Sequence, residues 1–275
     1  MSKEAKGKTI RLTPGRKLVE ELLHHARKAP TLPLSRLCLL PDVVDARAAL
    51  AKAPSWTAIF MKAYALVAAA IPELRRAYLP YPYRRLYEHP HSTCAILVER
   101  EWQGEPTVLG AKILAPENAT LRQIDDHLRH FREEEVRKIS PFRQLLRLGR
   151  LPGFLRRFVF WSSLYFSGAK RAKRFGTFMM SSLGTYGVEQ GHPLTPLTTY
   201  FSFGPISPEG AVTLKIIYDH RVMDGRAIAR ALVQLEETLN TAILDELRTL
   251  SVNDQMPQDA PHERPASTKN KPRAA

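Results

Sequence analysis

The stretch IIYDHRVMDGRAIARALVQLEETL, residues 216–239, changes its hydrophobic period in the middle. Apolar and polar residues alternate over 211–218, which indicates a β-strand. After Gly225 the apolar residues recur every three or four positions, as in an amphipathic helix. His220 and Asp224 therefore lie on a turn between two regular elements, where catalytic side chains are commonly held.

Helical and strand patterns also alternate along the rest of the chain. Helices are predicted over 13–29, 55–71 and 120–139, and strands over 34–40, 93–98, 106–113, 175–181 and 198–205. These patterns fill residues 11–250, and the length fits one large domain or two small ones. The polar stretches 1–10 and 251–275 have too few apolar residues to order themselves and are predicted to be disordered tails.

The bulk composition is that of an ordinary globular protein. Of 275 residues, 44% are hydrophobic and 25% are charged, and the length allows a large core. The two cysteines, Cys38 and Cys94, are far apart and form no metal-ligand pair, and no signal-peptide pattern is present. We therefore expect buried thiols, no metal site and a cytoplasmic location.

The net charge of +14 is concentrated in residues 137–174, which contain eleven Lys or Arg and no Asp or Glu. The longest uncharged run there, 158–169, is too short to cross a bilayer, which needs about 20 residues. Two interpretations remain: a surface helix and loop that packs on an oligomer, or an interfacial element whose Arg and aromatic side chains contact lipid. The second places 141–174 on the inner face of a membrane. Nucleic-acid binding is not expected, because no recognition fold accompanies the charge.

His220 is the first candidate for catalysis. A neutral imidazole is the natural general base for removing a proton from a hydroxyl or thiol. A single histidine is more often structural, so its position on the turn and the nearby Asp224 and Gly225 are what favour a catalytic role.

Three motifs carry a resemblance to a known family. The stretch 216–239 resembles the C-terminal signature of the dihydrolipoamide acyltransferases of 2-oxoacid dehydrogenase complexes, and also the H-x-x-x-D-G signature of the related chloramphenicol acetyltransferases. GTFMMSSLGTYG at 176–187 resembles the serine motif of the first family, and PELRRAY at 72–78 with HPHSTCAILVE at 89–99 resembles a segment of the second. The resemblance implies an α/β fold of two layers, a mixed sheet with helices, in a homotrimer.

The resemblance also implies a mechanism. His220 would be the general base on the acyl acceptor, and Ser181 would donate a hydrogen bond to the tetrahedral oxyanion, with Ser182 as its nearest rival. Asp224 would hold the loop through Arg16, with Arg221 and Gly225 supporting the turn. In this family the histidine and the serine come from different subunits of the trimer. No metal and no bound cofactor are implied.

The chain departs from the family in two ways. No lipoyl domain or linker precedes the first helix, and a basic, aromatic insertion occupies about 140–174. We therefore expect an acyltransferase that takes its acyl group from acyl-CoA or an acyl carrier protein and passes it to a small or lipidic acceptor. Two alternatives stay open: a dihydrolipoamide acyltransferase that uses the lipoyl group of a separate protein, and a non-catalytic trimeric scaffold.

Overall fold

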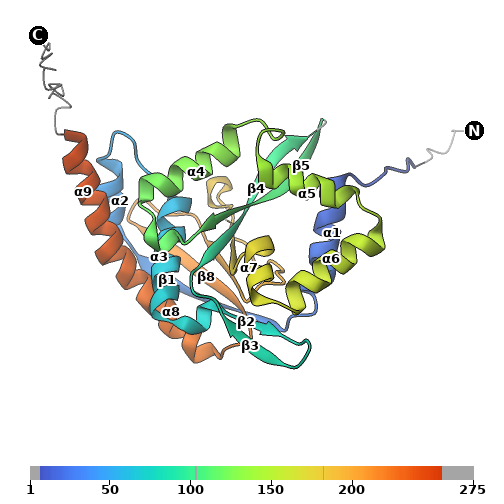
Figure 1. Ribbon diagram of the computed structural model, residues 1–275. Helices are drawn as coiled ribbons and strands as arrows, with labels where there is room; N and C mark the ends of the chain where they lie inside the picture. The colour runs from blue at the N-terminus through green and yellow to red at the C-terminus, as the bar shows by residue number, and fades with distance from the viewer. Residues whose placement is uncertain (1–6, 103, 182, 256–275) are drawn as a thin grey trace, which may run out of the picture.

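The computed structural model describes residues 7–102, 104–181 and 183–255. The helices are α1 (Pro14–Ala26), α2 (Pro41–Ala48), α3 (Trp56–Ala70), α4 (Leu121–Glu133), α5 (Ser140–Arg150), α6 (Gly153–Tyr165), α7 (Gly168–Phe175), α8 (Gly225–Thr238) and α9 (Leu244–Gln255). The strands are β1 (Thr31–Leu39), β2 (Arg76–Leu79), β3 (Arg85–Glu88), β4 (Thr93–Trp102), β5 (Glu105–Leu114), β6 (Phe178–Met180), β7 (Thr199–Phe203) and β8 (Ala211–Asp219). Figure 1 shows the helices packed around a central sheet.

That sheet has six strands in the order β1-β8-β7-β6-β4-β5, and β2 and β3 form a separate hairpin. The strand β6 runs parallel to both β4 and β7, whereas the other neighbouring pairs are antiparallel. The sheet is therefore mixed, and the predicted α/β class is confirmed. All six predicted strands are present in it, with ends that differ by a few residues.

The two faces of the sheet bury different clusters. Along β4, Cys94 and Ile96 join the main core, where α3, α4, α8 and α9 also pack, while Ala95 belongs to a second cluster on the opposite face. Leu22 of α1 and Phe175 of α7 pack against that second cluster. The helix α3 is buried nearly all round, as its continuous apolar sequence predicts.

The C-terminal helix extends past the predicted domain boundary at residue 250. Helix α9 continues to Gln255, because Leu247 is fully buried and Leu250 packs against the main core, so the apolar face carries the helix onward. Residues 251–255, predicted to begin the tail, are thus helical. Residues 1–6 and 256–275 lie outside the described residues, and 7–13 have no regular structure.

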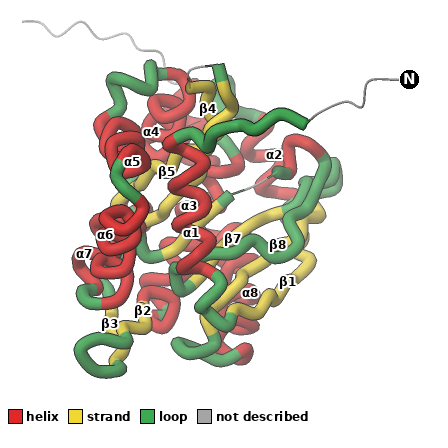
Figure 2. The backbone as a smooth tube through the Cα atoms, turned by 90° about the vertical axis from the view of Figure 1, so that its right-hand side faces the viewer, coloured by secondary structure: helices red, strands yellow, loops and turns green. Residues whose placement is uncertain are grey.

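The basic insertion forms three helices, α5, α6 and α7, which follow one another down one side of the molecule (Figure 2). The prediction of one surface helix and a loop is therefore wrong in detail. Helix α5 packs on α1 and β5, and α6 packs on α1. Phe160 and Leu164 of α6 are buried against Leu18 of α1 in a third apolar cluster. Much of the apolar side of the insertion is thus covered by its own chain.

Candidate active site

The turn between β8 and α8 is fixed by Asp219 and Arg221. Asp219 is buried at the end of β8, and its carboxylate accepts hydrogen bonds from Nε (2.9 Å) and Nη2 (2.7 Å) of Arg221 and from the Arg221 backbone amide (3.0 Å). The Arg221 guanidinium also lies over the Tyr78 ring, 4.6 Å from its centre. Burial lowers the pKa of Arg221, but the hydrogen bonds and charge of Asp219 outweigh burial, so the pKa is raised overall. Arg221 therefore stays charged and is tied to the turn through Asp219.

His220 is held by backbone groups on both sides. Its amide donates to the carbonyl oxygen of Pro30 (3.1 Å), and its Nδ1 lies 3.1 Å from the carbonyl oxygen of Met223. A carbonyl oxygen can only accept a hydrogen bond, so Nδ1 must carry the proton. The other ring nitrogen, Nε2, then has a free lone pair. Because 45% of the side chain is exposed, the imidazole can meet a substrate as a base.

Asp224 lies near His220 but does not meet Arg16. Its Oδ1 is 3.5 Å from Nδ1 of His220, and 87% of its side chain is exposed. Arg16 is exposed on α1, and within the described part of the chain it forms no ion pair. The pairing of Asp224 with Arg16, predicted from the resemblance, is therefore not present. The carboxylate instead favours the same Nδ1-protonated form of His220.

Gly225 begins α8 close to β8. A Cβ atom at this position would come 3.3 Å from the Tyr218 hydroxyl and 3.6 Å from Leu34. The first contact is tighter than most, so a small residue suits this close approach of helix and strand.

Ser181 follows β6 and belongs to a short hydrogen-bond chain. Its hydroxyl oxygen accepts from the side-chain amide of Gln190 (3.4 Å), whose carbonyl oxygen accepts from the Tyr200 hydroxyl (3.2 Å). Burial raises the pKa of Tyr200, and its side-chain hydrogen bonds with Ser181 and Gln190 oppose that rise, so the three side chains form one connected group. Gln190 was not predicted from the sequence, since a single polar residue in a loop forms no pattern. Ser182 lies outside the described residues.

Ser181 and His220 do not meet within one chain. Strand pairing places Met180 level with Phe201 and Ile216, so Ser181 is level with Lys215, five residues before His220 along β8. At about 3.3 Å per residue this separates the two residues by roughly 16 Å along the strand direction, and β7 lies between their strands. A reacting group touching both would need the serine of one chain and the histidine of another.

Comparisons with known proteins define the fold. The structure is similar to the dihydrolipoamide acetyltransferase of Azotobacter vinelandii (18% identity, TM-score 0.64), covering 87% of this chain and 94% of that one. It is also similar to the cubic core of a pyruvate dehydrogenase multienzyme complex (17% identity, TM-score 0.62, 87% and 94% covered) and to a truncated 2-oxoacid dehydrogenase complex core from Thermoplasma acidophilum (14% identity, TM-score 0.61, 86% and 99% covered). The chain therefore has the fold of these acyltransferase cores, as the resemblance predicted.

The Azotobacter enzyme was studied for the roles of a serine, a histidine and an asparagine in its catalytic mechanism, the asparagine four residues after the histidine. The sequence of the present chain matches no family model, and no curated protein sequence matches it significantly. Among the helices of residues 7–255, none combines the length and the apolar character that a bilayer crossing requires.

Proposed function

We propose that the chain is an acyltransferase in which His220 is the general base. The observation that carries this proposal is the hydrogen bond from Nδ1 to the Met223 carbonyl, which makes Nε2 the basic nitrogen of the neutral imidazole, on a side chain that is 45% exposed. Nε2 takes the proton of an acceptor hydroxyl or thiol while the acceptor atom attacks the thioester carbonyl carbon. The C–S bond then breaks, and the leaving thiolate takes the proton that the imidazolium received from the acceptor. The fold and the four-residue spacing from His220 to Asp224 agree with the Azotobacter enzyme.

Ser181 is proposed to stabilise the oxyanion. To donate to the oxyanion, its hydroxyl hydrogen would turn away from Tyr200, with which Ser181 shares a hydrogen bond, while Gln190 continues to donate to Oγ. A donor aimed at the developing negative charge contributes about 10²–10³-fold to the rate. Asp224 assists by favouring the Nδ1-protonated tautomer, and Arg221 and Gly225 hold the turn.

The separation of Ser181 from His220 supports a homotrimer with each active site between two subunits. The cubic core among the similar structures is likewise an assembly. The proposed donor is acyl-CoA or an acyl carrier protein, and the acceptor is small or lipidic. A lipoyl group on a separate protein is the second candidate for the thioester partner, favoured by the dihydrolipoamide transferases of the same fold.

Thiol release tests this proposal. The purified protein is incubated with a panel of acyl-CoAs, with and without a cell lipid extract or dihydrolipoamide, and free thiol is measured. Release should depend on an acceptor, and His220→Ala should remove nearly all of it while the circular dichroism spectrum stays unchanged. Acceptor-dependent release that survives His220→Ala would overturn the mechanism. No release under any condition would favour the scaffold alternative.

A peripheral position on a membrane is proposed for residues 141–174. Phe154 and Phe158 of α6 are 74% and 60% exposed, and arginines accompany them. In liposome co-sedimentation the protein should bind anionic vesicles more strongly than neutral ones. The binding should weaken as salt rises, because salt screens the attraction between the cations and the headgroups beyond about 8–10 Å. If the protein does not bind anionic vesicles, a water-soluble acceptor is the better assignment.

A further inference from the structure

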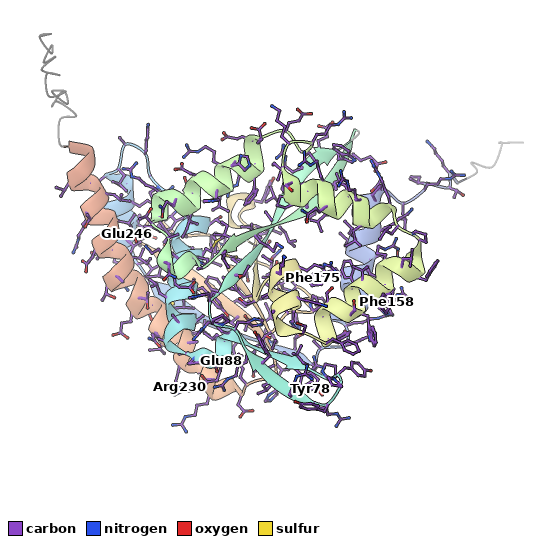
Figure 3. The ribbon with its side chains drawn as sticks, in the orientation of Figure 1. Tyr78, Glu88, Phe158, Phe175, Arg230 and Glu246 are labelled. Carbon is purple, nitrogen blue, oxygen red and sulfur yellow. The ribbon has the colours of Figure 1, made fainter. Side chains whose placement is uncertain are left out.

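A cavity of about 690 Å³ lies between α1 and α6, on the chain's own insertion. Its volume is within the range of small-molecule sites. One wall is aromatic, formed by Phe154, Phe158 and Trp161 of α6. Phe158 projects at the edge of the molecule (Figure 3) and is 60% exposed. Exposed rings beside a cavity are costly in water, so this wall suits an apolar chain or ring.

The cavity lining also includes buried polar atoms that have no hydrogen-bond partner and face the Glu21 carboxylate at ion-pair distance. His25 and Arg156 line the cavity and are 2% and 8% exposed, yet His25 Nε2 and Arg156 Nε have no hydrogen-bond partner in the described residues. The nearest carboxylate oxygens, both on Glu21, are 3.6 Å away. Buried polar atoms normally find a partner, so a polar group of a bound molecule is expected at this end.

The charge at this end favours an anion. The N-terminus of α6, at Gly153 and Phe154, opens onto the cavity, and its N-cap Pro152 has no side-chain hydrogen bond to offer. The first N–H groups of a helix and its positive dipole end attract negative charge. Three cations, Lys28, Arg156 and Arg157, stand at the cavity against two carboxylates, Glu20 and Glu21.

The segment after α1 runs from the cavity toward the turn that carries His220. Lys28 lines the cavity, and two residues further on the Pro30 carbonyl accepts the amide of His220. His25, which also lines the cavity, is hydrogen-bonded through Nδ1 to the Tyr165 hydroxyl (3.2 Å). The cavity and the proposed base are thus connected through residues 28–30.

We infer that the cavity between α1 and α6 binds an anionic amphiphile, with its carboxylate or phosphate at Arg156 and the α6 N-terminus and its apolar part on Phe154 and Phe158, and that this molecule is the acyl acceptor. The acceptor assignment rests on the proposed function, whereas the binding site does not. An amphiphile free in solution and one presented by a membrane share this chemistry.

Binding is measured with dodecyl phosphate, below its micelle concentration, by calorimetry on the full chain carrying His220→Ala. Saturable binding at one molecule per chain is expected, at least tenfold tighter than dodecyltrimethylammonium, which has the same chain and the opposite charge. Phe158→Ser and Lys28→Gln should each weaken binding about five- to tenfold, since one removes apolar contact and the other charge. Both side chains are exposed, so neither substitution should unfold the protein.

Two matched variants control for general losses. Leu114→Ser removes an apolar side chain that is 74% exposed elsewhere, and Lys52→Gln removes an exposed lysine away from the cavity. Both should bind dodecyl phosphate as the parent does. Equal binding of the cationic amphiphile, or equal losses in the control variants, would overturn the site.

Turnover tests the acceptor assignment with wild-type His220. The probe is 1-lauroyl-glycerol 3-phosphate, which has a phosphate and a free hydroxyl, offered as dispersed monomer or in neutral vesicles with acyl-CoA. Phe158→Ser should raise KM for this probe about tenfold with little change in kcat. If the acceptor is taken from a membrane, the rise in KM should appear only when the probe is offered in vesicles. Binding without acylation of this probe, while another acceptor is acylated, would overturn the acceptor assignment. Binding with no transfer to any acceptor would reject the proposed function and leave the site standing.

Discussion

At the residue scale, the tautomer of His220 depends on a backbone carbonyl more than on a carboxylate. The Met223 oxygen is closer to Nδ1 than Asp224 Oδ1 is, 3.1 Å against 3.5 Å, and the carboxylate is largely exposed to solvent. An exposed ion pair of this kind contributes little, about 0–1 kcal/mol. Asp224 therefore adds a small preference for the Nδ1-protonated tautomer of His220 and does not hold the loop.

Substitutions at Asp224 and Arg16 should separate these two roles. Asp224→Asn is expected to lower kcat by no more than about tenfold, because the Met223 carbonyl still selects the tautomer. Arg16→Met should leave the free energy of unfolding within about 0.5 kcal/mol, because the side chain is exposed and forms no ion pair in the described chain. Urea unfolding and initial rates measure both. Coupled losses in the double variant would show that Asp224 and Arg16 meet after all.

His25 and His89 should make the fold sensitive to acid. Burial, followed by the charge of Lys28, lowers the pKa of His25 to about 4, and burial, followed by Arg171, lowers the pKa of His89 to about 4. The unfolded chain, with a histidine pKa near 6.5, binds more protons than the folded chain below that pH. Stability is therefore present above pH 6.5 and is lost as the pH falls toward 4, by on the order of 1–2 kcal/mol per histidine.

Urea unfolding at pH 7.5 and pH 5, at one protein concentration, measures this loss. His25→Gln should reduce the difference between the two pH values, since glutamine does not titrate. The exposed His127 supplies a matched control, and His127→Gln should leave the difference as it is in the wild type. An unchanged difference in His25→Gln would contradict the assignment.

At the element scale, α6 has two apolar sides with different roles. Phe160 is 2% exposed, stacks on His25 and belongs to the cluster with Leu18, whereas Phe158 is 60% exposed beside the cavity. Of these two apolar sides of α6, only the first packs on α1.

Two phenylalanine substitutions should therefore differ in stability. Phe160→Ala should lower the free energy of unfolding by about 3–5 kcal/mol, because it opens a cavity between α6 and α1. Phe158→Ala should change it by less than about 0.5 kcal/mol. Chemical denaturation followed by circular dichroism compares them. Similar losses in both variants would mean that α6 is not docked on α1 through Phe160.

The insertion also shows where sequence reasoning stops. Alternation was enough to predict β8, because its polar and apolar residues separate cleanly onto two faces. In α6 no such separation exists: Phe154 and Phe158 are as apolar as Phe160, and only the position of α1 decides which ring is covered. The turn at His220 was predicted because the period changes there, whereas Gln190 was not.

At the scale of the whole molecule, the register of the sheet decides how the active site is assembled. Ser181 follows β6 and His220 follows β8, two strands with β7 between them, and strand pairing places the two residues at opposite ends of the sheet, roughly 16 Å apart along the strand direction. A tetrahedral intermediate needs a base and an oxyanion donor within hydrogen-bond reach of one small centre. Under the proposed mechanism, one folded chain would therefore carry two halves of different sites.

Mixing two inactive variants tests this arrangement. His220→Ala and Ser181→Ala chains, each with low activity alone, are denatured together, refolded in equal amounts and assayed for thiol release. If each site takes its histidine from one subunit and its serine from the next, half of the sites receive an intact histidine and half of those an intact serine. Activity should then return to about a quarter of the wild-type value. The same variants mixed without denaturation should stay inactive, because subunits do not exchange. If refolded mixtures also stay inactive while refolded wild-type protein recovers, both side chains act within one chain and the trimeric site is wrong.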